Sequence, residues 1–161
     1  MTTHDYNECV ERYADALYGF AYQYLKDSFE AENVVQNTFE KLWVRLADVE
    51  VKTAKAFMYK ITYNNCIDII RRSKRETQID EGAEMGHTHN DQYSDAMEIV
   101  RKAVQLLPEN QKTVVMLRDY EGYDYRSISE ITGMTEGQVK INIFRARKFL
   151  KSYIKDIHAV I

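Results

Sequence analysis

Proline, cysteine and long apolar runs are all scarce in this sequence of 161 residues. A single proline and six glycines exclude collagen-like and proline-rich chains, and they argue against an all-β fold with many tight turns. No apolar run is long enough to span a bilayer, and the first ten residues lack the basic flank and apolar core of a secretory signal. The two cysteines, Cys9 and Cys66, have no CxxC or Cys/His spacing, so we expect buried, reduced thiols in a cytoplasmic protein.

Charge is unevenly placed along the chain, although the formal net charge is only −3. Residues 76–95 contain six acidic and no basic side chains, together with Gly82 and Gly86, and show no sustained hydrophobic period. We therefore predict a flexible acidic linker between two small domains, residues 1–75 and 96–161. The linker contains His87 and His89 but no further histidine or cysteine at ligand spacing, so we expect no metal site and no cofactor.

The first domain has the hydrophobic period of three helices. One apolar stripe recurs at steps of three and four residues and consists of Tyr6, Val10, Tyr13, Leu17, Phe20 and Tyr24. Asp27 is the expected N-cap of a second helix, whose stripe consists of Val35, Phe39, Leu42 and Leu46. A third helix is expected over residues 53–72 and ends in the basic run RRSKR. Because this helix is apolar on more than one side, we expect it to face the bundle on one side and a partner on the other.

The second domain is predicted to contain four helices, over residues 96–106, 108–120, 124–132 and from 135 onward. Pro108 suits the first turn of the second of these helices, and Gly122 ends it. Gly133 is free to take a positive φ before Thr135 and Gln138, which form a T-x-x-Q capping box. A short helix, a glycine-containing turn and a longer capped helix are typical of a helix-turn-helix. The whole chain is thus predicted to have an all-α fold.

The last helix is strongly basic, since residues 138–155 contain six Lys or Arg side chains and no acid. A run of charged side chains is usually only a solvated surface. This run lies on the longer helix of a helix-turn-helix pattern and therefore indicates DNA binding. Lysine and arginine would neutralise phosphates there, while Gln138 could reach base edges in the major groove. Because the chain is acidic overall, we expect it to bind DNA weakly alone and to act as a subunit of a larger assembly.

Three segments stand out together, namely residues 29–46, FEAENVVQNTFEKLWVRL, residues 56–72, AFMYKITYNNCIDIIRR, and residues 107–151. They resemble parts of bacterial RNA polymerase sigma factors of the extracytoplasmic-function group, in the sigma-70 family. The helix that docks on core polymerase is similar to residues 29–46. The helix that reads and opens the minus-ten element is similar to residues 56–72. The domain that reads the minus-thirty-five element is similar to residues 107–151. The resemblance implies a transcription initiation factor with two domains, sigma regions 2 and 4, that directs core RNA polymerase to promoters and aids their melting.

The resemblance also assigns roles to residues of the first domain. The polymerase-binding positions match Asn33, Gln36, Asn37, Phe39 and Trp43. Phe39 also lies on the apolar stripe, so core packing remains an alternative. The minus-ten DNA-binding positions match Phe57, Tyr59, Asn64, Asp68, Arg71 and Arg72. Tyr59 and Tyr63 could stack on single-stranded bases or be buried, and Asp68 could simply pair with Arg72 one helical turn away.

The minus-thirty-five positions lie in the last helix. The groove-facing ones match Glu136, Gln138, Lys140, Ile141, Phe144 and Arg145, and Arg147, Lys148 and Lys151 suit phosphates. The family often has Ser-Arg where this chain has Ile141 and Asn142.

Two other classes of function are alternatives to this one. A conventional helix-turn-helix regulator would bind operators without polymerase. An enzyme is not expected, because the chain has no Gly-rich phosphate loop, HExxH or GxSxG motif. The partners that the resemblance implies are core RNA polymerase, promoter DNA and an anti-sigma factor, often membrane-bound, which would hold a cytoplasmic chain at the inner membrane. No small-molecule substrate is expected.

Overall fold

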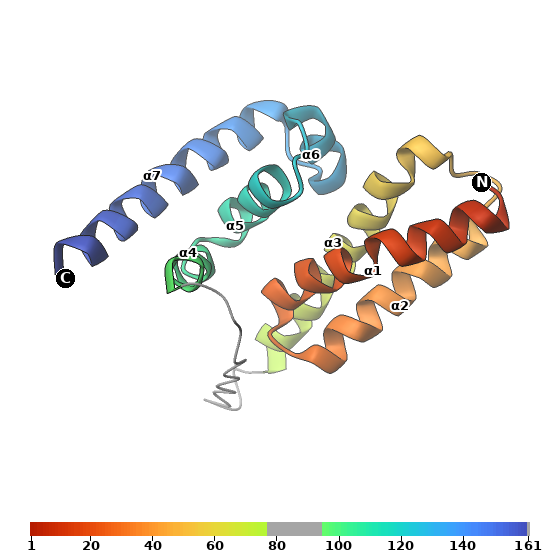
Figure 1. The fold of residues 1–161 in the computed structure, drawn as a ribbon, viewed down its shortest axis with the longest axis horizontal. Helices are drawn as coiled ribbons and strands as arrows, with labels where there is room; N and C mark the ends of the chain where they lie inside the picture. Colours follow the sequence, from red (N-terminus) through yellow and green to blue (C-terminus); the bar gives the residue numbers. More distant parts are fainter. Residues whose placement is uncertain (77–94, 161) are drawn as a thin grey trace. The chain divides into compact units, whose positions relative to one another are not determined.

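The computed structural model describes residues 1–76 and 95–160, and all regular structure within these ranges is helical (Figure 1). The chain divides into two compact units, Met1–Ala83 and Glu84–Ile161. The prediction of an all-α fold with two helical domains is confirmed. Residues 77–94, which make up most of the predicted acidic linker and include His87 and His89, lie outside the described residues.

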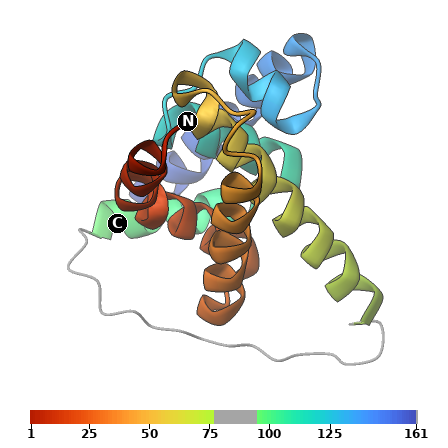
Figure 2. The ribbon, with the colours of Figure 1, turned by 90° about the vertical axis from the view of Figure 1, so that its right-hand side faces the viewer.

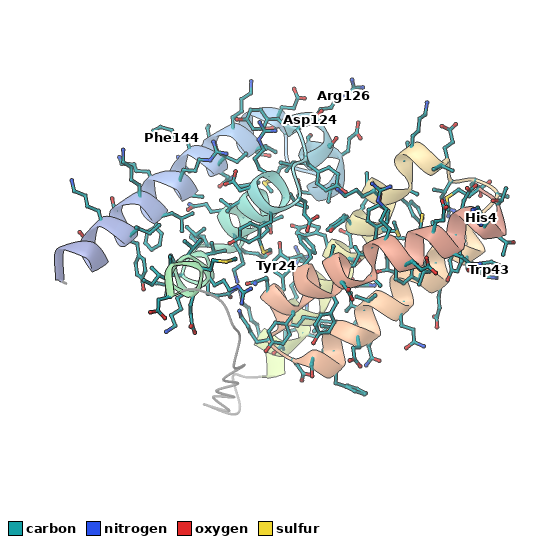
Figure 3. The ribbon with its side chains drawn as sticks, viewed as in Figure 1. His4, Tyr24, Trp43, Asp124, Arg126 and Phe144 are labelled. Carbon is teal, nitrogen blue, oxygen red and sulfur yellow. The ribbon has the colours of Figure 1, made fainter. Side chains whose placement is uncertain are left out.

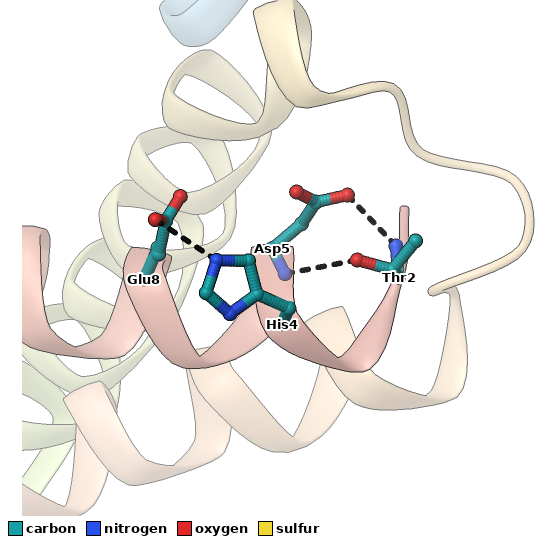
Figure 4. A network of polar contacts seen from close by, with 4 residues as sticks. All are labelled: Thr2, His4, Asp5 and Glu8. Atoms are coloured by element: carbon teal, nitrogen blue, oxygen red, sulfur yellow. Dashed lines mark hydrogen bonds and ion pairs between the residues drawn. The ribbon is translucent and has the colours of Figure 1, made fainter.

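The first unit is a bundle of α1 (Thr3–Leu25), α2 (Ser28–Val44) and α3 (Val51–Glu76). A capping box begins α1, since the Thr2 hydroxyl accepts from the Asp5 amide at 3.1 Å and the Asp5 carboxylate accepts from the Thr2 amide at 2.9 Å (Figure 4). The predicted N-cap Asp27 is confirmed, because its Oδ1 accepts from the amide of Phe29 at 2.9 Å. Figure 2 shows the C-terminal turns of α3 extending beyond the other two helices of this unit.

The core of the first unit is built from both apolar and small polar side chains. Phe20 packs edge-on against Tyr59, with ring centroids 5.3 Å apart. The buried hydroxyls of Thr38 and Thr62 lie 2.8 Å apart and join α2 to α3. The core side of α2 therefore includes Thr38, whereas the predicted stripe counted only large apolar residues. Polar but hydrogen-bonded threonines are invisible to a pattern of hydrophobicity alone.

Both cysteines are free and buried, as predicted. Burial raises the pKa of the Cys66 thiol to about 12, and it also raises the pKa of Cys9. The neutral thiols therefore behave as small apolar side chains of the core.

The second unit consists of α4 (Asp95–Gln105), α5 (Glu109–Val115), the π-helix η1 (Met116–Tyr120), α6 (Tyr125–Thr132) and α7 (Glu136–Val160). The predicted helix over 108–120 is therefore not uniform. Pro108 is its N-cap and not part of its first turn, and its last five residues form a π turn. The amide of Glu121 donates to the carbonyl of Met116 at 3.2 Å, one residue farther back than in an α-helix.

The helix-turn-helix is formed by α6, the turn at Gly133 and α7. The Asp124 carboxylate caps α6 by accepting from the Ser127 amide at 2.8 Å, and this hydrogen bond lowers the pKa of Asp124. Gly133 has φ +81° and its amide donates to the carbonyl of Ser129 at 2.9 Å. The capping box of α7 is confirmed, since the Thr135 amide donates to Gln138 Oε1 at 2.9 Å and the Gln138 amide donates to the Thr135 hydroxyl at 3.1 Å.

We expect Gly133→Ala to lower the stability of the second unit by about 1 kcal/mol, because a side chain at this φ is strained. A Cβ at Gly133 would meet nothing within 4 Å, so a backbone penalty is the whole effect. Gly137→Ala, within α7, is the matched control and should be neutral or stabilising. Urea unfolding followed by circular dichroism measures the change, and Trp43 fluorescence, the only tryptophan signal, reports separately on the first unit. Equal transitions for both variants would contradict the strain argument.

Candidate nucleic-acid interface

The outer face of α3 is polar and mainly basic. Its core side is fixed by Met58, Thr62 and Cys66, which have no exposed surface. At 100° per residue, the opposite side of the helix carries several of the predicted minus-ten residues. The exposed members are Asn64, Asp68, Arg71 and Arg72, and Phe57 is half-buried beside them. Lys60 and Arg75 extend the same exposed face, although neither was among the residues predicted to bind the minus-ten element.

Tyr59 does not belong to this face. Its ring is 0% exposed and packs in the core against Phe20, and Lys55 Nζ lies 6.0 Å from the ring centroid. Tyr63 is also buried, with its ring edge-on to Tyr24 at 6.3 Å. The prediction that Tyr59 stacks on bases is therefore wrong, because both faces of its ring are covered by the bundle.

The outer face of α2 combines amides with exposed apolar side chains. Asn33 and Gln36 are exposed, Asn37 is half-buried and Trp43 is 50% exposed. The ring of Trp43 is held edge-on by Tyr6 of α1, with centroids 5.0 Å apart, and Figure 3 shows it at the end of the first unit near His4. This face therefore offers hydrogen-bonding groups around an oriented aromatic ring.

The structure corrects the assignment of Phe39 to the polymerase-binding positions. It is buried and packs edge-on against Tyr6 at 6.5 Å, while the Tyr6 hydroxyl donates to the Phe39 carbonyl at 3.2 Å. Core packing is therefore the correct interpretation for this side chain.

Two strongly exposed apolar side chains of α2, Phe29 and Val44, were missed because they lie outside the predicted stripe and outside the matched motif positions.

The outer face of α7 gathers most of the predicted minus-thirty-five residues. Val139, Ile143 and Ala146 are buried against the rest of the unit, and this contact sets the rotation of the helix. The exposed side chains are Glu136, Gln138, Lys140, Ile141, Phe144, Arg145, Lys148 and Lys151. Figure 3 shows Phe144 on the side of α7 that faces away from α5. The helix thus presents cations and apolar side chains together on one surface.

Arg147 has a partner inside the unit. Its Nη2 lies 2.7 Å from Oδ1 of Asp119, on the π-helix η1, and this bond raises the pKa of Arg147. In the unbound chain this exposed guanidinium therefore already has one carboxylate partner, and its assignment to a phosphate stays a prediction. No spacing in the sequence pointed to this pair, because it depends on the π turn.

Tyr125 lies between two cations that the sequence did not connect. The guanidinium carbon of Arg118 is 5.0 Å from the Tyr125 ring centroid, and Lys140 Nζ is 5.8 Å from it. Arg118 also donates to the carbonyl of Tyr123 at 2.9 Å. These contacts join the π-helix, the start of α6 and α7 into one basic edge.

Within residues 1–76 and 95–160, no three His, Cys, Asp or Glu side chains gather as a group that could hold a metal. His4 lies 3.2 Å from Glu8 in an exposed pair on α1 (Figure 4). None of the helices in the same part of the chain combines the length and the apolar character that crossing a membrane requires.

Known families match both units of the chain. Residues 9–76 match the family described as Sigma-70 region 2, and residues 97–150 match Sigma-70, region 4. The sequence is 30% identical to RNA polymerase sigma factor SigV of Bacillus subtilis over 149 residues, which cover 89% of this chain and 87% of SigV. It is 26% identical to the ECF RNA polymerase sigma factor SigM of the same organism over 151 residues, 91% of this chain and 93% of SigM.

A solved structure has a similar fold. The sigma factor RpoE from Bartonella quintana, crystallised in complex with the anti-sigma factor NepR, is 26% identical, with a TM-score of 0.80 over 94% of this chain and 97% of that one. Together with the two family matches and the basic outer face of α7, these likenesses show that the chain belongs to the sigma-70 family, as an extracytoplasmic-function sigma factor that directs RNA polymerase to promoters.

Proposed function

We propose that this sigma factor binds core RNA polymerase through the outer face of α2 and recognises the two promoter elements with the outer faces of α3 and α7. The observation that carries the proposal is a set of exposed cations on α7, the second helix of the helix-turn-helix, namely Lys140, Arg145, Lys148 and Lys151. These side chains can neutralise phosphates while the start of the helix lies in the major groove.

The outer face of α2 suits a protein partner more than a nucleic acid. Asn33 and Gln36 supply amide donors and acceptors without charge, and the half-exposed ring of Trp43 supplies apolar area in a fixed orientation. Aromatic anchors of this kind dominate the binding energy of many protein interfaces. We therefore assign Asn33, Gln36, Asn37 and Trp43 to core polymerase.

The outer face of α3 suits DNA. Arg71 and Arg72 supply charge for phosphates, and Asn64 supplies an amide that can hydrogen-bond to a base edge. Phe57, half-buried at the margin of this face, is the remaining aromatic candidate for base stacking once Tyr59 is excluded. We assign this face to the minus-ten element, with residues 1–75 as sigma region 2 and residues 96–161 as region 4.

No covalent step is part of this function, and we infer that the chain is not an enzyme. Strand separation at the minus-ten element draws on binding free energy in the assembled complex.

We also propose that an anti-sigma factor controls the chain, since the similar RpoE was crystallised with one. The protein would then act in the cytoplasm, and would be held at the inner membrane when that inhibitor is membrane-bound.

Run-off transcription from a promoter library tests the whole proposal. Core RNA polymerase with this protein should initiate at a defined set of promoters that core polymerase alone does not use. Site-specific DNA binding by the protein without any association with polymerase would contradict it and would favour a conventional helix-turn-helix regulator.

Trp43→Ala should weaken binding to core polymerase by roughly tenfold or more, because it removes the oriented aromatic ring of the α2 face. Biolayer interferometry with immobilised core polymerase measures the affinity. Val51→Ala, which shortens an exposed apolar side chain outside α2, is the control and should bind like the parent. The assignment of α2 would be withdrawn if Trp43→Ala and the parent had equal core affinity.

Lys148→Glu combined with Lys151→Glu should lower promoter affinity and flatten its dependence on salt. Each lost phosphate contact is expected to reduce the slope of log affinity against log salt by about 0.9. A double variant with the same change of net charge elsewhere, Arg12→Glu with Lys102→Glu, separates local contacts from overall charge. The same slope for parent and α7 variant would argue against phosphate contacts by this helix.

Asp119→Asn should release Arg147 and so strengthen DNA binding. The salt dependence should become steeper by up to about 0.9 in slope, because one more cation can meet a phosphate. The exposed ion pair itself should contribute less than about 1 kcal/mol to stability. Glu8→Gln, which removes one acid from α1, is the control for net charge. An unchanged salt slope in Asp119→Asn would mean that Arg147 stays away from DNA even when it is unpaired.

A further inference from the structure

Two large apolar side chains occupy the outer face of α7 at the point where the helix would meet bases. Ile141 is 51% exposed and Phe144 is 68% exposed. Both project from the side of the helix opposite to Val139 and Ile143, which are buried. Single exposed apolar residues are ordinary on protein surfaces, so exposure alone assigns no role. The role of these two residues is inferred from the polar groups that lie beside them.

The side-chain amides beside these two residues are already engaged within the domain. Gln138 Oε1 accepts from the Thr135 amide at 2.9 Å, and this bond is half of the capping box of α7. Asn142 Nδ2 donates to the Gln138 carbonyl at 2.8 Å and lies 3.7 Å from the sulfur of Met134. A bidentate contact with adenine requires both the oxygen and the nitrogen of one amide. The cap fixes the orientation in which the Gln138 amide can offer its Nε2 donors and the second lone pair of Oε1.

Ile141 and Phe144 therefore add two exposed apolar groups to the polar and charged groups of the base-facing part of the helix. In the major groove, the apolar feature by which a base edge is distinguished is the C5 methyl group of thymine. The surroundings favour DNA as the partner, since Lys140, Arg145 and Lys148 flank the apolar pair and residues 138–155 contain no acid. A positively charged rim complements phosphates on both sides of the groove.

We propose that Ile141 and Phe144 recognise thymine C5 methyl groups in the major groove of the minus-thirty-five element. This inference rests on the proposed placement of α7 in that groove and adds the chemical feature that is read there. These methyl contacts act beside any hydrogen bond that Gln138 makes in the orientation set by the capping box. Lys148 holds the helix against the backbone without selecting sequence.

The test uses holoenzyme assembled from core RNA polymerase and the full chain. A duplex library randomised at the minus-thirty-five element first gives the preferred sequence. Each thymine of that element is then replaced by deoxyuridine, which removes the C5 methyl group and keeps base pairing. We expect a roughly threefold to tenfold loss of affinity at one or two of these positions, the effect of one buried methyl group.

The Ile141→Ala variant shows whether this side chain reads the methyl group. It should bind the thymine template more weakly than the parent and lose its sensitivity to deoxyuridine at one position, since the two changes remove the same contact. Lys148→Ala is the matched control and should weaken binding to thymine and deoxyuridine templates by the same factor.

Three results would overturn the inference. A clear minus-thirty-five preference with equal affinity for thymine and deoxyuridine templates would reject methyl recognition and leave the proposed function standing. An Ile141→Ala variant that binds core polymerase more weakly but keeps the parental deoxyuridine effect would assign the apolar pair to a protein contact. No preference at the minus-thirty-five element at all would reject the placement of α7 and the proposed function together.

Discussion

The packing of one helical face into a small core determines every functional surface of this protein. A helix in a domain of this size buries a single stripe, and the opposite side stays in solvent. In α7 the buried stripe is Val139, Ile143 and Ala146, with at most 2% exposure. That stripe fixes the rotation of the helix, and so directs Ile141 and Arg145 outward. Ile141 and Arg145 are therefore presented to solvent by the packing of the opposite side of the helix.

The same constraint separates two kinds of chemistry within the first unit. The outer face of α2 carries amides, the Trp43 ring and the exposed Glu40, whereas that of α3 is made mainly of cations such as Arg71 and Arg72. Because the faces lie on different helices, a protein and a nucleic acid can be bound by one bundle without competing for side chains. Because the chain has a net charge of −3, each surface is expected to bind its partner only weakly by itself. Binding through several surfaces at once multiplies the overall affinity.

Local features of the fold could be predicted from the sequence, and features that depend on distant packing could not. Asp27, Gly133 and the Thr135–Gln138 box act within a few residues, so their spacing alone identified them. The burial of Tyr59 depends on Phe20, from another helix, and an exposed and a buried tyrosine look alike in a sequence. The pairing of Arg147 with Asp119 was equally hidden, because it joins residues 28 positions apart through an irregular turn.

The irregular turn also limits how this part of the chain can vary. In Met116–Tyr120 the backbone bonds reach back one residue farther than in an α-helix, which accommodates one additional residue in the coil. Deleting a single residue there would allow a regular α-helix, but would swing the following side chains by about 100° around the axis. Asp119 would then point away from α7, and Arg118 away from Tyr125. Evolution can therefore exchange side chains in this segment more readily than it can change the segment's length.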